Sequence, residues 1–318
     1  MNAPSLATLA LLPALWGCAS FHAGAMPGEP PKASFAQVAG ARVRYTDTGK
    51  GPAVVLIHGF ASSLETWDTV APLLVKTHRV VSLDLKGFGW TDRAEGDYSP
   101  EAQAKIVLQI MDKLGIDKAA IVGHSWGSSV SLALALKAPE RVTRLALYDA
   151  WVYEEQLPST FLIARAPVLG EVLFTLFYDQ RPDERLALAF YNKDFLTEKL
   201  AEDVEKSLER PGTNAAALAA VRGQRFTEQQ SKYRTIDKQV LLLWGRDDVV
   251  TTLPFGERLS RELPHARLVV YPRCGHFPMF EARNESNAEL IKFLAQDGQD
   301  PPRPAAASPD QKPAEEKK

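Results

Sequence analysis

Residues 119–137 read AAIVGHSWGSSVSLALALK, and this stretch decides the fold. Its first four residues are a short apolar run that suits a strand buried on both faces. Gly123-His124-Ser125-Trp126-Gly127 follows, and the pattern from Ser128 to Lys137 predicts a helix. A G-x-S-x-G sequence between a strand and a helix is typical of a nucleophile elbow, a tight turn that projects the serine hydroxyl above the sheet. Ser125 is therefore the candidate nucleophile.

Further strands and helices alternate on both sides of this unit. Five apolar runs predict strands: Ala53–Ile57, Arg79–Leu83, Val142–Leu147, Val240–Leu243 and Arg267–Val270. Between two of them, Ser99 followed by Pro100 predicts a helix start with Ser99 as its N-cap. Strands separated by helices imply crossover connections, so we expect an α/β fold with a mainly parallel central sheet and helices on both faces.

The alternation stops between residues 151 and 233, where amphipathic helical segments such as Asp183–Tyr191 and Thr197–Glu209 replace the strands. We expect residues 35–150 and 234–296 to form the core, and residues 151–233 to form an inserted helical lid. Residues 297–318 combine Pro, Ala and mixed charge without apolar periodicity. Such a tail buries too little apolar surface to offset its ordering entropy, so we predict that it is disordered.

The N-terminus, residues 1–25, has the character of a bacterial export signal. Leu6 to Leu15 form a short apolar stretch that suits the h-region of a signal. Leu15-Trp16-Gly17-Cys18 resembles the lipobox of bacterial lipoproteins, although Trp16 and the lack of Lys or Arg before Lys32 depart from that pattern. We expect an exported protein of the cell envelope, tethered to a membrane by a lipid on Cys18, with residues 26–34 as a spacer. The alternative is a cleaved signal and a periplasmic or secreted protein.

Composition excludes several classes of protein and partner. Lys and Arg number 37 and Asp and Glu 39, so the net charge is 37 − 39 = −2, and 45% of residues are hydrophobic. The hydrophobic content and the near-zero net charge exclude a wholly disordered chain. Because the sequence has no long run of basic residues, we do not expect a nucleic-acid partner. The histidines lack metal-ligand spacing, so we expect no metal and no cofactor. The oligomeric state stays open.

A serine hydroxyl becomes a nucleophile when a base takes its proton and an acid orients that base. The base candidate is His276, which follows the last predicted strand and so lies at the same sheet edge as Ser125. Three acids follow predicted strands at that edge: Asp247 and Asp248 after one strand, and Asp149 after another. Residue types and spacing alone leave the choice among them open.

These features together resemble the α/β-hydrolase superfamily, from about Phe35 to Ala295. Five segments carry the resemblance, in the order found in that family: His58-Gly59-Phe60, Asp84–Gly89, Gly123–Gly127, Trp244–Asp248 and Gly275–Pro278. The resemblance implies a catalytic triad in the order Ser125, Asp248, His276, because the acid is the last Asp in members with a W-G-x-x-D pattern. It also implies an oxyanion hole made by the backbone N–H groups of Phe60 and Trp126.

The resemblance further implies a serine hydrolase without cofactor or metal. Its expected reaction is cleavage of a carboxylic ester or related acyl bond, in a small to medium apolar substrate, through an acyl-enzyme. Ser rather than Asp at the elbow disfavours the epoxide hydrolase and haloalkane dehalogenase branches. A carbon–carbon bond hydrolase, an aminopeptidase-like enzyme, a non-hydrolytic lyase or peroxidase, and a ligand-binding relative without turnover remain alternatives.

Mass spectrometry of the mature protein tests the predicted anchor. If Cys18 is lipidated, the mature chain begins at Cys18 and carries the added mass of its acyl chains, because the leader is removed and the lipid replaces it as the membrane contact. A Cys18→Ser variant should then leave the membrane fraction. An unmodified Cys18, or a mature chain that starts beyond residue 18, would rule the anchor out.

Overall fold

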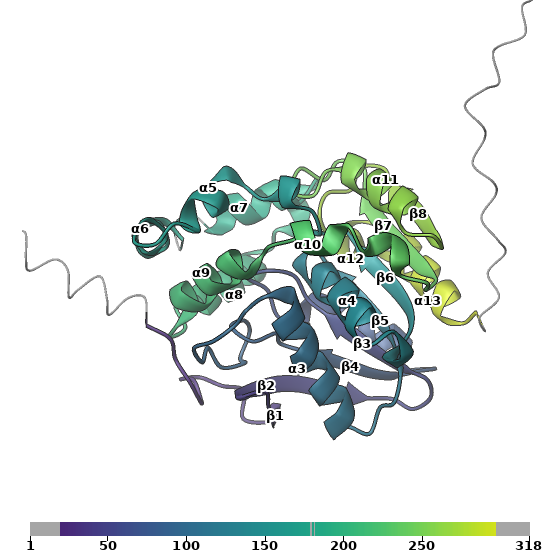
Figure 1. Ribbon diagram of the computed structural model, residues 1–318, viewed down its shortest axis with the longest axis horizontal. Helices are drawn as coiled ribbons and strands as arrows, with labels where there is room; N and C mark the ends of the chain where they lie inside the picture. Colours follow the sequence, from purple (N-terminus) through teal and green to yellow (C-terminus); the bar gives the residue numbers. More distant parts are fainter. Residues whose placement is uncertain (1–19, 179, 181, 297–318) are drawn as a thin grey trace, which may run out of the picture.

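A mainly parallel sheet of eight strands runs through the computed structural model, which describes residues 20–178, 180 and 182–296 (Figure 1). The strand order is β1-β2-β4-β3-β5-β6-β7-β8, and every neighbouring pair after β4 is parallel. This confirms the predicted α/β fold. The strands are β1 (Ser34–Val38), β2 (Ala41–Thr48), β3 (Ala53–Ile57), β4 (Arg79–Leu83), β5 (Ala119–His124), β6 (Val142–Tyr148), β7 (Val240–Gly245) and β8 (Ala266–Tyr271).

Helices cover both faces of this sheet. On β3, Val55 and Ile57 point into one hydrophobic core with α3, α4 and α11, while Val54 and Leu56 point into another with α2, α12 and α13. Burial on both faces explains why these strands are continuous apolar runs. The helices around the sheet are α2 (Ala71–Leu74), α3 (Pro100–Lys113), α4 (Trp126–Lys137), α11 (Leu253–Glu262), α12 (Pro278–Glu281) and α13 (Arg283–Leu294), with the 3₁₀ turns η2 (Leu64–Trp67) and η3 (Pro139–Arg141).

The predicted helix start at Ser99 is confirmed in atomic detail. The Ser99 hydroxyl oxygen accepts a hydrogen bond from the Ala102 amide at 3.2 Å, and Pro100 is the first residue of α3. This bond satisfies one of the free N–H groups of the first helical turn. A short serine side chain and a proline therefore define where α3 begins.

The hairpin of β1 and β2 was not predicted from the sequence. These strands pair antiparallel and join β4 antiparallel as well, which makes this edge of the sheet the exception to its parallel order. Ala39 and Gly40 form the turn, with φ of 48° and 76°. Positive φ at both turn residues suits a tight hairpin, but the usual Asn-Gly signal is absent. The strands were also overlooked because only part of each is buried, so neither reads as an apolar run.

A helical insertion separates β6 from β7, and its larger helices form a group apart from those that flank the sheet (Figure 1). The insertion contacts core residues that follow the ends of β3 and β8. Phe161 of the insertion packs on Phe60, which follows β3, and the Ala189 carbonyl of the insertion accepts from the amide of His276, which follows β8, at 2.7 Å. The insertion thus lies at the carboxyl edge of the sheet; its action as a lid stays a prediction. Its elements are η4 (Glu154–Gln156), α5 (Ser159–Ala164), α6 (Leu169–Phe177), α7 (Pro182–Ala189), η5 (Lys193–Phe195), α8 (Glu198–Leu208), α9 (Thr213–Gly223), α10 (Thr227–Gln230) and η6 (Tyr233–Thr235).

Part of the stretch predicted as leader and spacer packs on the folded body. The His22 amide and carbonyl bond to Arg93, Met26 is buried, and Glu29 forms an ion pair with Arg42 at 2.6 Å. The predicted spacer, residues 26–34, therefore contacts the core at Glu29, whose carboxylate pairs with Arg42 on β2. Cys18 and the predicted tail lie outside the described residues. Within the described residues, no helix is long and apolar enough to span a bilayer.

Two glycines allow the turn between β5 and α4 to be tight. A Cβ atom on Gly127 would lie 2.4 Å from the Ile57 carbonyl oxygen and 2.5 Å from that of His58. A Cβ atom on Gly123 would lie 2.5 Å from the Ser131 hydroxyl oxygen. Backbone atoms cannot move aside as a flexible side chain can, so α4 approaches β3 this closely only because Gly127 lacks a side chain.

Replacing Gly127 should therefore destabilise the whole fold. We expect Gly127→Ala to lower the free energy of unfolding by about 1–3 kcal/mol, as overpacking in a closed interior does. Denaturant unfolding followed by circular dichroism measures this difference. Lys137→Ala, at the exposed end of the same helix, is the control and should stay close to wild type. Equal stability of the two variants would contradict the close packing described here.

Candidate active site

Ser125 occupies the turn between β5 and α4 in a conformation that few residues adopt, with φ of 50° and ψ of −121°. The end of β6 holds this turn in place. The Ser125 amide donates to the Tyr148 carbonyl at 2.9 Å, and the Ser125 carbonyl accepts from the Trp151 amide at 3.1 Å. A non-glycine residue in such a strained conformation persists only where its surroundings impose it, as at a nucleophile elbow.

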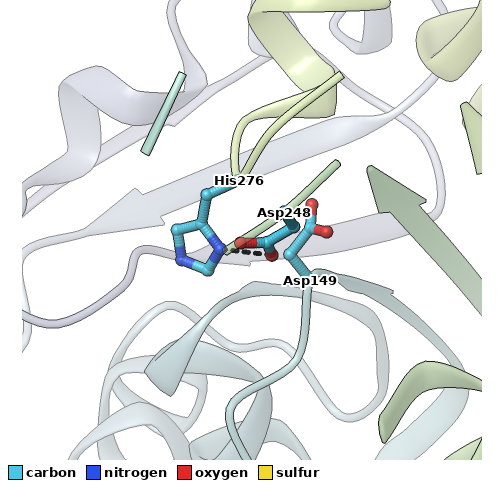
Figure 2. A group of neighbouring side chains, drawn as sticks. All are labelled: Asp149, Asp248 and His276. Atoms are coloured by element: carbon cyan, nitrogen blue, oxygen red, sulfur yellow. Dashed lines mark hydrogen bonds and ion pairs between the residues drawn. The ribbon is translucent and has the colours of Figure 1, made fainter. Parts of the chain in front are cut away.

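His276 and Asp248 lie together, as the sequence predicted. The Nδ1 atom of His276 is 2.8 Å from Oδ2 of Asp248 (Figure 2). The Asp248 carboxylate also accepts from the amides of Val250 and Thr251, at 2.7 and 3.1 Å, and from the Thr251 hydroxyl at 2.7 Å. Burial opposes ionisation of this carboxyl group, but His276 and these donors hold its pKa well below the usual value. Asp248 is thus ionised, and Nδ1 of His276 carries the donated proton.

His124 connects this pair to the elbow. Its imidazole is fully enclosed, and burial next to His276 lowers the pKa of His124 to about 3. The neutral ring therefore donates its Nε2–H to the carbonyl oxygen of His276 at 2.9 Å. Because His124 directly precedes Ser125, this bond fixes the His276 loop beside the nucleophile turn. His124 thus has a structural role: it positions the loop that carries His276.

The loop that carries Phe60 also borders the elbow. The His58 ring donates from Nδ1 to the Gly59 carbonyl at 2.7 Å and accepts the Leu85 amide at Nε2 at 2.9 Å. A Cβ atom on Gly59 would lie 3.1 Å from the Cβ atom of Ser125, so this loop and the elbow are in close contact. Among the described residues, the amides of Phe60 and Trp126 have no hydrogen-bond acceptor. Both remain able to donate to a bound group.

The other two acid candidates have different surroundings. Asp247 is exposed, and its Oδ2 accepts from the Arg273 amide at 2.9 Å. Asp149 is buried beside Asp248, and its Oδ1 accepts from the Gly245 amide at 2.9 Å. Thr251, which donates to Asp248, was missed by the sequence analysis. No motif marks it, since its partner is defined only by the turn that follows β7.

Asp149, Asp248 and His276 also form a group whose donor atoms lie within 4.8 Å of one another in the described part of the chain, a spacing that a metal ion could bridge. The Asp248 and His276 atoms are already engaged with each other, however, and Oδ1 of Asp149 accepts from the Gly245 amide. A metal would have to replace a short charge-assisted hydrogen bond. The donor set thus fits an acid–base pair better than a metal centre.

An aromatic cluster lies beside the Phe60 loop. The Phe60 ring contacts those of Phe88, Phe161 and Tyr178, with centroid distances of 5.2, 5.4 and 6.4 Å, and Trp151 stacks on Phe161 at 5.8 Å. Phe161 and Tyr178 belong to the insertion, so the cluster joins it to the core. A separate hollow of about 660 Å³, lined by Tyr98, Arg222 and other residues, includes none of the predicted site residues.

Known proteins match this chain over most of the folded body. The family model described as alpha/beta hydrolase fold matches residues 52–283, which include the elbow, Asp248 and His276. The chain belongs to the alpha/beta hydrolase fold family. It is accordingly an enzyme of the hydrolase type, which removes the ligand-binding alternative without turnover.

Three relatives of this alpha/beta hydrolase illustrate the range of the family. A 2-hydroxy-6-oxo-2,4-heptadienoate hydrolase of Pseudomonas putida is 31% identical, over 78% of this chain and 91% of that protein. The solved meta-cleavage product hydrolase from Pseudomonas fluorescens is 28% identical with a TM-score of 0.69, covering 82% of this chain and 96% of that one. A thermophilic esterase from Thermogutta terrifontis is 23% identical with a TM-score of 0.70, covering 83% and 98%, and shows the shared fold.

The roles of Asp247 and Asp248, the two adjacent acids that follow β7, can be separated by mutation. We expect Asp248→Asn to lower kcat by about 10⁴-fold, because the amide removes the charge that holds the His276 tautomer. Asp247→Asn should stay within about twofold of wild type, since surface substitutions of this kind rarely matter. Steady-state kinetics on a chromogenic ester measures both variants. If Asp247→Asn lost more kcat than Asp248→Asn, Asp247 would be the acid that orients His276.

Proposed function

We propose that this enzyme is a serine hydrolase that cleaves a carboxylic ester, or a related acyl bond, of a small to medium apolar substrate through an acyl-enzyme. One observation carries the proposal: the strained Ser125 turn is joined, through the bond from His124 to the His276 carbonyl, to a histidine whose Nδ1 is bound, at 2.8 Å, to a buried and ionised aspartate. An imidazole oriented in this way has its Nε2 free to accept a proton.

In the proposed reaction, the Ser125 hydroxyl oxygen attacks the substrate carbonyl carbon while Nε2 of His276 takes the hydroxyl proton. Asp248 stabilises the resulting imidazolium. His276 then returns the proton to the leaving group, and the acyl-enzyme forms. Water, activated by the same imidazole, releases the acid. The amides of Phe60 and Trp126 would bind the developing oxyanion, an interaction worth about 3–4 kcal/mol per donor at comparable sites.

Aromatic side chains support an apolar substrate. The Phe60 ring lies next to one of the proposed oxyanion donors, and Phe161 and Tyr178 of the insertion pack against it. Rings of this kind contribute large apolar contact area with few rotatable bonds. An acyl or alcohol group close to the scissile bond would therefore meet an apolar wall, part of which the proposed lid supplies.

The second candidate is hydrolysis of a carbon–carbon bond. The 2-hydroxy-6-oxo-dienoate hydrolase and the meta-cleavage product hydrolase, at 31% and 28% identity, favour it. In that reaction the leaving group is a carbon that must be protonated before or during cleavage, whereas an ester releases an alcohol. The same nucleophile, base and oxyanion donors serve both reactions, so the substrate decides between them.

Export is a proposal that rests on the leader alone. The lipobox-like Leu15-Trp16-Gly17-Cys18 supports a membrane tether through a lipid on Cys18, which would place the hydrolase at the bacterial cell envelope. A signal cleaved without lipidation would give a periplasmic or secreted enzyme. The small-molecule substrate expected for this family is compatible with either location.

A substrate panel with Ser125→Ala as the control tests the function. We expect the wild type to hydrolyse chromogenic short-chain esters, and Ser125→Ala to lose at least about 10³-fold in kcat while it keeps the wild-type unfolding midpoint. The panel includes a 2-hydroxy-6-oxo-dienoate and an aminoacyl anilide. Preference for the dienoate would support carbon–carbon cleavage instead, and near-normal kcat in Ser125→Ala would remove Ser125 as the nucleophile.

A further inference from the structure

Asp149 is a buried carboxyl group that the proposed reaction does not use. It follows β6 with φ of 41°, and its side chain is fully buried. Its Oδ1 accepts from the Gly245 amide at 2.9 Å, whereas its Oδ2 has no hydrogen-bond donor among the described residues. A buried carboxylate with a single neutral donor would be strongly destabilising. The second oxygen therefore needs an explanation.

Asp149 lies beside Asp248, whose carboxylate is bonded to the imidazole of His276 (Figure 2). Oxygens of both carboxyl groups and a ring nitrogen of His276 lie within 4.8 Å of one another. Two carboxyl groups this close in a buried site cannot both be ionised without a large electrostatic cost, so one of them keeps a proton.

The hydrogen-bond partners decide which group keeps the proton. Asp248 accepts from His276, from two amides and from the Thr251 hydroxyl, and all of these stabilise a negative charge. Asp149 accepts from one amide only. The charge therefore belongs on Asp248 and the proton on Asp149.

The other groups around Asp149 act in the same direction. Burial raises its pKa well above the usual value, the charge of Asp248 adds to this, and Glu281 on α12 adds a smaller effect. The Gly245 amide opposes the shift. Burial raises the pKa of the Cys274 thiol and of the Tyr148 hydroxyl, so both stay neutral. Among the main contributors in the described part of the chain there is no cation that would favour an ionised Asp149.

We propose that Asp149 is a positioning residue, held as a neutral carboxylic acid whose Oδ2–H donates a hydrogen bond to Asp248. This bond would fix the Asp248 carboxylate against His276 without adding a second negative charge to the site. Its kinetic consequence rests on the proposed function, but the protonation state does not.

Asparagine is the matched substitute for a neutral Asp149. Its carbonyl oxygen can accept from Gly245, its NH₂ can donate to Asp248, and asparagine tolerates positive φ. We expect Asp149→Asn to keep kcat within about threefold of wild type, whereas Asp149→Ala, which lacks the donor, loses about 10- to 100-fold in kcat. Asp247→Asn serves as the control for an acid of the same sheet edge.

The pH–rate profile separates this role from simple packing. The acidic limb of kcat/KM reports the general base of the free enzyme. If Asp149 is already neutral, Asp149→Asn leaves the midpoint of this limb unchanged. If Asp149 were ionised, its replacement would remove a negative charge beside the imidazole and move the midpoint down by about 1 pH unit or more.

Two measurements test the protonation state of Asp149 without relying on enzyme activity. The infrared spectrum of the wild type at pH 7 should contain a protonated-carboxyl band that is absent from Asp149→Asn and present in Asp247→Asn. Unfolding provides the second. A group whose folded pKa is raised lowers stability as pH rises above its unfolded pKa, about 3.9. Asp149→Asn should therefore be more stable than wild type at pH 7, and the difference should vanish towards pH 4.

The outcomes distinguish this proposal from the proposed function. An identical infrared spectrum in wild type and Asp149→Asn, or a lowered midpoint in Asp149→Asn, would overturn the neutral Asp149. A loss of activity in Asp149→Asn as large as that in Asp248→Asn would also overturn the neutral Asp149. It would identify Asp149, which follows β6, as the acid of the triad. If no panel substrate is cleaved while the band and the stability difference appear as expected, the proposed function fails and the neutral Asp149 stands.

Discussion

The tight turn at Ser125 is the constraint on which the rest of the structure depends. It joins a fully buried strand to a helix that is buried from Trp126 to Ala135, and α4 can lie against β3 only because Gly127 has no side chain. Backbone strain at such a residue costs on the order of 1–3 kcal/mol, and it persists because the surrounding sheet fixes both ends of the turn. The hydrogen bond from Ser125 to the end of β6 makes the neighbouring strand part of that support.

Around this turn, buried polar groups take the protonation states that their partners impose. His58 and His124 are neutral, because burial disfavours their charged forms, and each then has one N–H to donate and one nitrogen that can accept. Both donate to backbone carbonyls, so they fix the loops that carry the oxyanion candidates and the base. Electrostatics in this dry region therefore contributes to positioning as much as to chemistry.

Asp149 and Asp248 show how two identical residues acquire different properties. Both follow neighbouring parallel strands, and both are buried. The turn after β7 directs two amides and the Thr251 hydroxyl at Asp248, whereas Asp149 receives one amide. The number of donors, rather than residue type or exposure, separates an ionised acid from a neutral one.

Local sequence determined much of this protein. Apolar runs marked the six central strands, Ser99 marked the start of α3, and the glycines around Ser125 marked the elbow, because each of these depends on neighbouring residues in the chain. The β1–β2 hairpin was missed because its strands are only partly buried and its turn has Ala39 where Asn is usual. Sequence order also brought His276 and the acids to one edge, but it could not separate Asp149 from Asp248. Only the tertiary structure decided that, since the turn after β7 directs the Val250 and Thr251 donors at Asp248, and the other partners, His276 for Asp248 and Gly245 for Asp149, lie far away in the chain.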